Sequence, residues 1–380
     1  MRRDLPILDT LVIGAGPAGL GTALALDAVN TLSYGVVERG QIGESVRRWP
    51  VHVTFLTPSF TGNGFGSTDL NSVHPDTSPA FSLGTDYPTG AEYARYLRGV
   101  ATHFEVPVLS DTTVTAIDPV KDLTPGVPGF AVSTSRGSVT ARTVVWAGGE
   151  FHNPQQPEMV GTEHADHSSA VAAWTLRTGR VTVIGGYESG LDVACHHVDQ
   201  GCTVTLIDPH HPWDSGSGSD PSFALAPRTR LRLAAAQATG RLTLSANGRA
   251  TGIRRWNDDH YAVAVAGSAA TESHSRPIMA TGFGPGLGPA TALFDTRRDG
   301  WPLLDDNDES TTTPGLFLAG AALRHGGLKF CFVYKFRQRF AHVAGVIGDR
   351  LGKDCAALEA WRTAGMLTDD LSCCGTECAC

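Results

Sequence analysis

The sequence lacks both a long, purely apolar run and an excess of basic residues. A membrane-spanning helix needs about 20 consecutive apolar residues, and the chain has no such run, so we expect no membrane partner. The 30 Lys and Arg residues are outnumbered by 38 Asp and Glu, which gives a net charge of −8. Because binding to a phosphate backbone needs a basic face, nucleic acid is excluded as a main partner.

The N-terminus also lacks an uninterrupted secretory signal. Arg2 and Arg3 precede the apolar stretch 10–26, as in a signal peptide, but Asp4 and Asp9 interrupt the approach. Three glycines with the spacing of a glycine loop also lie inside the apolar part. We therefore expect a cytoplasmic protein whose thiols stay reduced.

The length and the glycine content favour two domains with many tight turns. A chain of 380 residues is too long for one ordinary hydrophobic core, and its 41% hydrophobic share is enough to bury two. The 44 glycines and 22 prolines predict frequent turns and close backbone approaches.

A strand, a glycine loop, a helix and a second strand open the chain. Residues 8–13 have the pattern of a short buried strand and lead into the loop Gly14-Ala-Gly-Pro-Ala-Gly19. An Ala- and Leu-rich helix is predicted over residues 17–30, and a second strand over residues 34–38. This order is a βαβ unit.

A related βαβ unit recurs in the middle of the chain. Its first strand is predicted over residues 180–184, followed by the loop Gly185-Gly-Tyr-Glu-Ser-Gly190. A helix to about residue 200 and a strand over residues 203–208 complete it. Two copies of one element predict two nucleotide-binding domains.

We predict an α/β fold with two Rossmann-like three-layer dinucleotide-binding domains, the second inserted into the first. Short alternating strands follow each βαβ unit, and a strand over 314–320 and a helix over 334–351 come last. The expected segments are residues 1–153 for the first part of one domain, 154–275 for the inserted domain, 276–365 for the second part, and 366–380 for a cysteine-rich tail.

The first glycine loop has the spacing that binds a pyrophosphate. Gly14 makes the tight turn, Gly16 lets the backbone approach the phosphates, and Gly19 lets the helix pack on the strand. Glu38 ends the second strand, where a carboxylate can hold an adenosine ribose hydroxyl. The candidate binding residues here are Gly14, Gly16, Pro17, Ala18, Gly19, Glu38 and Arg39.

The second glycine loop departs from this pattern at one position. Gly185 and Gly190 fit, but Tyr187 occupies the place of the middle glycine, where a side chain would crowd a pyrophosphate. The loop is therefore either a nucleotide site or a degenerate copy kept for architecture. The candidate binding residues are Gly185, Gly186, Tyr187, Glu188, Ser189, Gly190 and Asp208.

The nucleotide preference of the second loop stays open at this stage. Asp208 ends the second strand of the unit, where a carboxylate favours a free 2′-hydroxyl. Arg228 and Arg230 can instead serve a 2′-phosphate.

The motifs Gly14–Gly19, Gly185–Gly190, Ala280-Thr-Gly-Phe283 and Gly315-Leu-Phe-Leu-Ala-Gly320 resemble those of the two-dinucleotide-domain flavoproteins, over about residues 9–352. That superfamily includes flavin-containing monooxygenases, thioredoxin reductases and bacillithiol-disulfide reductases. The resemblance implies FAD on the first domain and NADPH or NADH on the second, with hydride passing from the nicotinamide to the flavin.

Several positions depart from those relatives. The chain has no CxxC, which thioredoxin reductases carry, and it has Ala18 where bacillithiol-disulfide reductases have a cysteine. Ala321, after Gly320, replaces the usual aspartate that holds the flavin ribityl chain. The stretch Phe336-Arg-Gln338 resembles the Tyr-Arg-Gln found beneath the flavin ring, so Gly320 and Gln338 join the expected flavin site, and residues 49–59 are expected to line its pocket.

Half of the eight cysteines lie in the last eight residues, at Cys373, Cys374, Cys378 and Cys380. Such a cluster can relay electrons by thiol–disulfide exchange. It can also bind a soft metal through four thiolates. The alternative is a terminus with incidental thiols.

The other cysteines and the paired histidines have simpler expectations. Cys331 is either a flavin-side thiol acting with the tail or a small buried hydrophobe. The remaining cysteines, expected in the core, are Cys195, Cys202 and Cys355. The pairs His196-His197 and His210-His211 lack metal-site spacing and are expected at solvated loop or helix-end positions.

Three functions remain compatible with the sequence. The first is an NAD(P)H-dependent FAD oxidoreductase that serves a small-molecule thiol, disulfide or thiophilic-metal acceptor, with the tail and Cys331 as catalytic candidates. The second is a flavin-containing monooxygenase that oxygenates a small molecule. The third is a non-enzymatic flavoprotein redox sensor or metal-binding module. The sequence leaves the oligomeric state, a homodimer included, undetermined.

Overall fold

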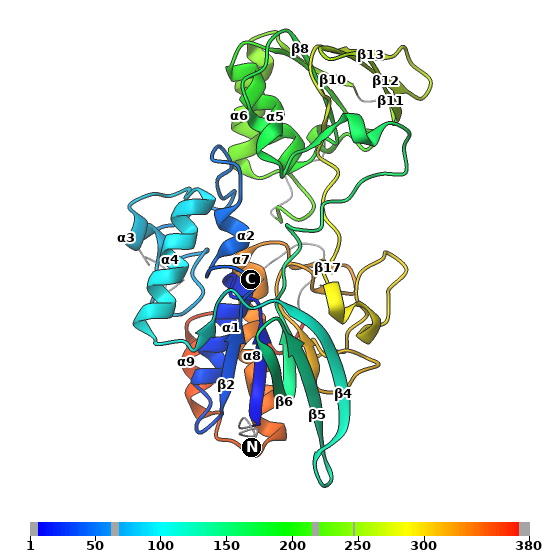
Figure 1. Ribbon diagram of the computed structural model, residues 1–380. Coiled ribbons are helices and arrows are strands. Elements are labelled where there is room, and N and C mark those ends of the chain that lie inside the picture. The colour runs from blue at the N-terminus through cyan, green and yellow to red at the C-terminus, as the bar shows by residue number, and fades with distance from the viewer. Residues whose placement is uncertain (1–6, 62–67, 215–219, 246–247, 372–380) are drawn as a thin grey trace. The chain divides into compact units, whose positions relative to one another are not determined.

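The computed structural model describes residues 7–61, 68–214, 220–245 and 248–371, and the chain divides into two compact units (Figure 1). The first unit takes its described residues from Met1–Arg48, Thr57–His152 and Pro285–Cys380. The second unit comprises Trp49–Leu56 and Asn153–Gly284. The predicted insertion of one Rossmann-like domain into another is confirmed.

The first unit is built on a seven-stranded sheet with the order β3-β2-β1-β6-β5-β4, and β15 also pairs with β6. Its strands are β1 (Leu8–Ile13), β2 (Tyr34–Val37), β3 (Val108–Leu109), β4 (Val114–Thr124), β5 (Val127–Thr134), β6 (Gly137–Trp146) and β15 (Leu316–Leu318). The second half of β6 runs parallel to β1 and β15, whereas its first half pairs antiparallel with β5. The carboxyl ends of three parallel strands therefore meet at one edge.

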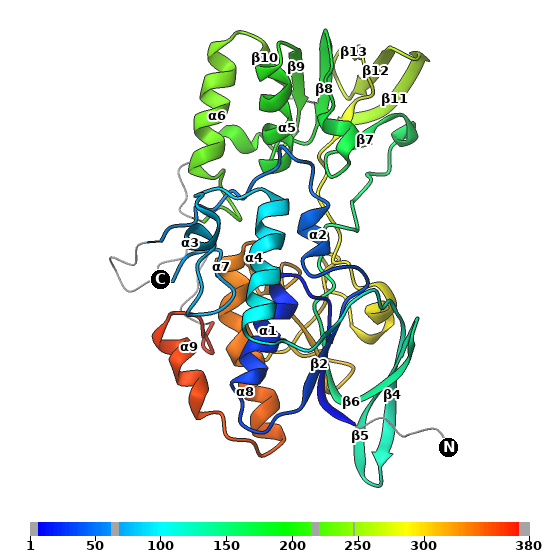
Figure 2. The same ribbon diagram turned by 60° about the vertical axis from the view of Figure 1, so that its left-hand side comes forward.

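The helices of the first unit include α1 and α8, which lie side by side along the sheet (Figures 1 and 2). The α-helices of this unit in the described residues are α1 (Pro17–Asp27), α2 (Glu44–Arg47), α3 (Pro79–Leu83), α4 (Gly90–His103), α7 (Val333–Phe336), α8 (Phe340–Arg350) and α9 (Glu359–Thr363). Contact between α1 and α8 requires a glycine, because a β-carbon at Gly21 would lie 1.9 Å from the Phe340 ring. A short hairpin, β16 (Arg324–His325) with β17 (Leu328–Lys329), precedes α7.

The helix predicted over residues 334–351 is interrupted. A 3₁₀ turn, Arg337–Arg339, separates α7 from α8. Both of its arginines are buried: Arg337 donates to the carbonyl oxygen of Asp69, and Arg339 donates to the Asp308 carboxylate over 2.8 Å. These long-range bonds leave no local trace in the apolar periodicity.

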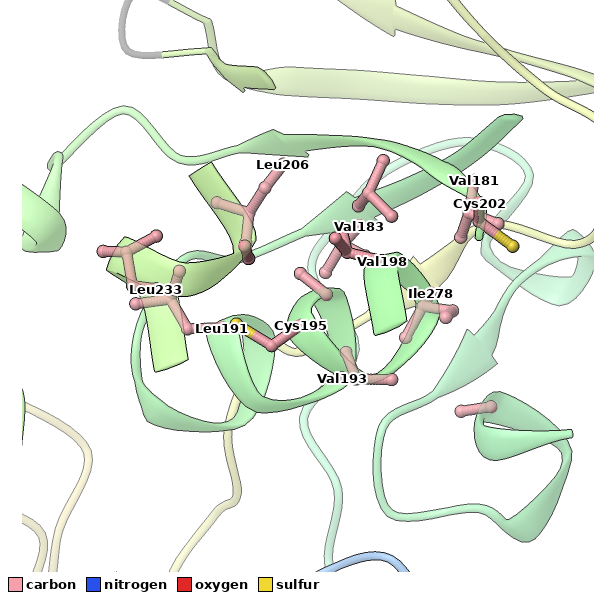
Figure 3. Close-up of a cluster of buried hydrophobic side chains, with 14 of the residues drawn as sticks. Val181, Val183, Leu191, Val193, Cys195, Val198, Cys202, Leu206, Leu233 and Ile278 are labelled. Carbon is pink, nitrogen blue, oxygen red and sulfur yellow. The ribbon is translucent and has the colours of Figure 1, made fainter. Parts of the chain in front are cut away.

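The second unit repeats the plan on a smaller scale. Its parallel sheet has the order β10-β9-β8-β14-β7, and β11, β12 and β13 form an antiparallel sheet. The elements are β7 (Asp166–His167), β8 (Arg180–Ile184), α5 (Glu188–Asp199), β9 (Thr203–Ile207), α6 (Pro227–Ala238), β10 (Leu242–Ser245), β11 (Ala250–Asn257), β12 (His260–Val265), β13 (Thr271–Ser273) and β14 (Ile278–Met279). Cys195 and Cys202 belong to the buried hydrophobic core of the second unit, as predicted (Figure 3).

The segment Trp49–Leu56 belongs to the second unit although it lies between elements of the first. Val53 packs against the core of the second unit, and the His52 ring lies 4.3 Å from the ring of His196. The helix-end position predicted for His196-His197 is confirmed, because both lie in the last turn of α5, but the expectation that they are solvated is wrong. Both histidines are buried, because the end of α5 is covered by this segment and by the carbonyl oxygens of residues 173 and 174.

Candidate functional site

Two glycines of the first loop are required by the fold itself. Gly14 has φ +108°, and a β-carbon there would lie 2.5 Å from the carbonyl oxygen of Ala147. A β-carbon at Gly19 would lie 1.8 Å from the carbonyl oxygen of Gly14. These residues let β1, the loop and α1 pass close to each other, as the sequence pattern predicts.

Gly16 is different, because nothing in the protein requires a glycine there. Its φ is −79°, and a β-carbon would meet no atom within 4 Å. Gly16 is also the N-cap of α1, and no side chain caps the first N–H groups of the helix. Bare backbone at a helix N-terminus fits a diphosphate, which binds through those N–H groups and the helix dipole.

Glu38 is fixed against this loop. Its Oε2 accepts a hydrogen bond from the N–H of Ala15 over 2.7 Å, and its Oε1 accepts one from the N–H of Gly40 over 2.8 Å. The carboxylate is buried, whereas the neighbouring Arg39 is exposed. Since each carboxylate oxygen can accept a further hydrogen bond, Glu38 can still receive ribose hydroxyls.

Gly320 adjoins the same loop from the end of β15. Its φ is +108°, and a β-carbon there would lie 2.9 Å from the β-carbon of Ala18. The N–H of Ala319 donates to the carbonyl oxygen of Trp146 over 2.9 Å, which extends the pairing of β15 with β6. Gln338 lies in the 3₁₀ turn, where its Oε1 is 3.2 Å from the hydroxyl of Thr368. Its role toward a flavin stays a prediction.

The second loop repeats the geometry of the first. A β-carbon at Gly185, where φ is +99°, would lie 2.3 Å from the carbonyl oxygen of Ala280, and one at Gly190 would lie 1.8 Å from that of Gly185. Asp208 takes the place of Glu38. Its Oδ2 accepts from the N–H of Gly186 over 2.7 Å, and its Oδ1 accepts from the N–H of His210 over 2.8 Å.

Tyr187 holds the position that corresponds to Gly16, as the N-cap of α5. Its hydroxyl lies 2.6 Å from the carbonyl oxygen of Pro221 and 3.1 Å from that of Ala224. Its ring packs against the core of the second unit. Tyr187 thereby ties the loop before α6 to the N-terminus of α5.

Glu188 and Ser189 complete the first turn of α5. Glu188 is buried and accepts hydrogen bonds from the Ala226 N–H, over 2.5 Å, and from the Thr229 hydroxyl. Burial raises the pKa of Glu188. Ser189, by contrast, is exposed. Glu188 is thus bound to the start of α6, and Ser189 is the one side chain of this turn that faces solvent.

The sequence did not predict a role for Glu150, which follows the Ala147-Gly-Gly149 turn at the carboxyl end of β6. Burial raises the pKa of Glu150 to about 7, and the charge of Arg324 opposes that rise. Cys331 is half-buried and interacts electrostatically with Arg324 and Glu150. Burial raises the pKa of its thiol. An acidic residue directly after a strand-end Gly-Gly was the one available signal.

The described residues hold no group of three or more His, Cys, Asp or Glu side chains that could bind a metal. The candidate cysteines Cys373, Cys374, Cys378 and Cys380 lie outside the described residues. Cys355 is half-buried rather than in the core, because it follows the last turn of α8 near the surface. None of the helices in the described ranges is long and apolar enough to cross a membrane.

Comparisons with known proteins agree on the class. The family profile described as pyridine nucleotide-disulphide oxidoreductase matches residues 11–320. An uncharacterized CzcO-like oxidoreductase of Geobacillus kaustophilus is 30% identical over 193 residues, which cover 50% of this chain and 51% of that protein. The match therefore spans about half the length of that relative.

Two solved structures share the fold. Bacillithiol disulfide reductase of Staphylococcus aureus superposes with a TM-score of 0.71 at 18% identity, covering 91% of this chain and 99% of that one. The ornithine N-hydroxylase of Kutzneria sp. 744, solved with reduced FAD, NADP⁺ and ornithine, has a TM-score of 0.67 at 20% identity, covering 91% and 100%. At these identities the two likenesses show that the fold is shared.

Proposed function

The chain belongs to the pyridine nucleotide-disulphide oxidoreductase family, and on that premise we propose that it is an NAD(P)H-dependent FAD oxidoreductase. The supporting observation is the duplicated glycine loop. Each copy has a positive-φ first glycine, a last glycine in contact with it, and a carboxylate bonded to the loop. Two such loops on one chain suit two dinucleotides.

The residues of the chain bind and orient. Gly14, Gly16 and Gly19 bring bare backbone to the diphosphate of FAD, and Glu38 accepts its ribose hydroxyls. The Gly185–Gly190 loop takes the nicotinamide nucleotide. FAD supplies the redox chemistry when it is bound, and the protein contributes position and exclusion of water.

The acceptor is a small-molecule thiol or disulfide, or a thiophilic metal, served by the C-terminal cysteines. Four cysteines within eight positions support this proposal, because clustered thiols exchange electrons or bind soft metals. Truncation after Leu371 should abolish turnover with such acceptors and leave reduction of the flavin by the nucleotide intact. Unchanged turnover after truncation would contradict a role for the tail.

An anaerobic titration of the purified yellow protein tests the core of the proposal. One equivalent of NADH or NADPH should bleach the flavin absorbance. If neither nucleotide did so, the protein would instead be a non-enzymatic flavoprotein, a redox sensor or metal-binding module. A colourless protein that takes up no flavin would contradict the whole assignment.

A flavin monooxygenase is the second candidate, and the cysteine positions favour it. The first loop has Ala18 where a reductase cysteine would lie. Among the residues that the structure describes, Cys195 and Cys202 are buried in the core of the second unit. Oxygen consumption that rises with an added small-molecule substrate, and that survives truncation after Leu371, would select this candidate.

A further inference from the structure

The two glycine loops are closed by the same carboxylate arrangement, which we call the loop clasp. In the first unit it consists of Glu38 with the N–H groups of Ala15 and Gly40, at 2.7 and 2.8 Å. In the second it consists of Asp208 with the N–H groups of Gly186 and His210, again at 2.7 and 2.8 Å.

The clasp determines what each carboxylate can offer a ligand. Each ionised oxygen has two lone pairs and no proton to donate. One lone pair on each oxygen is used by the clasp, so the other can accept a hydrogen bond from a ribose hydroxyl. A 2′-phosphate in the same place would bring two anions together with no donor between them. FAD has a free 2′-hydroxyl on its adenosine ribose, and the second clasp has the geometry of the first.

The charges that follow β9 are unfavourable to a 2′-phosphate. Residues 209–227 contain no Lys or Arg, but they contain Asp214 and Asp220. His211, the histidine closest to Asp214, has its Nδ1 3.8 Å from the Asp214 carboxylate. The stretch that follows Asp208 therefore supplies no Lys or Arg to a 2′-phosphate before Arg228.

Three arginines that follow this stretch in the sequence differ in their surroundings. Arg228 and Arg230, on the first turn of α6, interact electrostatically with Glu188 at the N-terminus of α5. The Nε of Arg230 also donates to the carbonyl oxygen of Leu225 over 2.9 Å. Arg249, after β10, is exposed and precedes β11. It follows Gly248, whose β-carbon would lie 3.8 Å from the Ile207 side chain at the end of β9, so it is a cation that a 2′-phosphate could recruit.

We propose that the second unit binds a nicotinamide nucleotide with a free 2′-hydroxyl, so that NADH rather than NADPH is the donor, and that Asp208 determines this specificity. The inference rests on the proposed function, since it names the nucleotide of the same site. It departs from the ornithine N-hydroxylase structure, which holds NADP⁺.

Binding can be measured without chemistry, on the oxidised protein with its flavin. Calorimetric titration with ADP-ribose should give a dissociation constant at least about tenfold lower than titration with 2′-phospho-ADP-ribose, a difference that corresponds to about 1.4 kcal/mol. The anaerobic rate of flavin bleaching should favour NADH over NADPH by a similar factor. Equal or tighter binding of the 2′-phosphorylated ligand would overturn the inference.

Variants separate the role of Asp208 from a general effect. Asp208→Asn should reduce the discrimination to below about threefold. His210→Arg, which keeps the backbone donor and adds a cation, should improve binding of 2′-phospho-ADP-ribose. The control Asp259→Asn changes an exposed acid in the turn between β11 and β12 and should leave the ratio unchanged. Arg249→Ala is made in the protein that keeps Asp208. If this substitution removed binding of 2′-phospho-ADP-ribose but not of ADP-ribose, Arg249 would bind the 2′-phosphate and the inference would fail.

The failure of this inference differs from the failure of the proposed function. Preferential reduction by NADPH would overturn the specificity and leave the oxidoreductase assignment intact. The absence of reduction by either nucleotide, together with no binding of either ribose ligand, would overturn both.

Discussion

The hydroxyl of Tyr187 lies 2.6 Å from the carbonyl oxygen of Pro221. A second carbonyl oxygen, that of Ala224, lies 3.1 Å away. Tyr187, which breaks the glycine pattern of the second loop, therefore holds the segment before α6 in place by hydrogen bonding. Its presence has a structural explanation that a sequence pattern alone does not supply.

Tyr187→Phe should lower the free energy of unfolding of the second unit by about 1 kcal/mol, because two partly buried carbonyl groups lose their donor. Thermal unfolding followed by circular dichroism measures the change. Tyr34→Phe is the matched control, since the Tyr34 hydroxyl meets the Asp27 carboxylate in an exposed setting. Equal effects of the two substitutions would show that the Tyr187 bond adds nothing.

Gly16→Ala and Gly19→Ala should separate ligand binding from folding. A β-carbon at Gly16 meets no protein atom, so the flavin-free protein should change in stability by less than about 1 kcal/mol. Its affinity for FAD should nevertheless fall by about tenfold or more, because the methyl group occupies the place of the diphosphate. Flavin content and a fluorescence titration report this loss.

Gly19→Ala should instead prevent the protein from folding stably. Its β-carbon would lie 1.8 Å from a backbone oxygen, and overpacking of this kind costs about 3 kcal/mol or more. Low solubility or a lowered unfolding temperature without flavin is the expected result. If Gly16→Ala were as unstable as Gly19→Ala, the open space at Gly16 would have no ligand role.

Glu150 should make the first unit less stable as the pH rises. Burial raises its pKa from 4.5 to about 7. Below pH 4.5 the carboxyl is protonated in both states; between pH 4.5 and 7 the unfolded chain ionises first, so the folded state loses stability. Glu150→Gln should flatten this loss in unfolding temperatures measured from pH 4 to 8. Glu158→Gln, at an exposed position, should leave the profile unchanged.

His197 should make the second unit less stable at acidic pH, and unfolding temperatures measured as a function of pH would show this. It is fully buried, and burial lowers its pKa from 6.5 to about 4. Above pH 6.5 the ring is neutral in both the folded and the unfolded state. As the pH falls from 6.5 to 4, the unfolded chain binds a proton at this ring and the folded state does not, so the folded state loses stability. His197→Gln should therefore weaken the acid sensitivity. A steeper acid response in the variant would contradict a neutral His197.

Local patterns in the sequence predict most of the fold. The strands Leu8–Ile13 and Arg180–Ile184 were predicted residue for residue, and both βαβ units and the nesting of the domains follow from repetition of one motif. Periodicity and turn residues carry this information because they act over a few neighbours.

What the sequence did not predict depends on distant partners. Glu150 acquires its raised pKa from burial beside residues far along the chain, and the 3₁₀ turn at Arg337–Arg339 depends on carbonyl and carboxylate groups near residues 69 and 308. The burial of His196 depends on His52, more than a hundred residues away in the chain. Such contacts exist only after the chain has folded.

The excursion of Trp49–Leu56 into the second unit has a practical consequence for anyone who dissects this protein. A recombinant fragment cut at Asn153 and Gly284 would leave the packing place of Val53 uncovered and expose an apolar surface to aggregation. Neither half can be excised as one uninterrupted stretch. Autonomous expression of the nucleotide-binding half would require the missing octapeptide to be grafted back or supplied in trans.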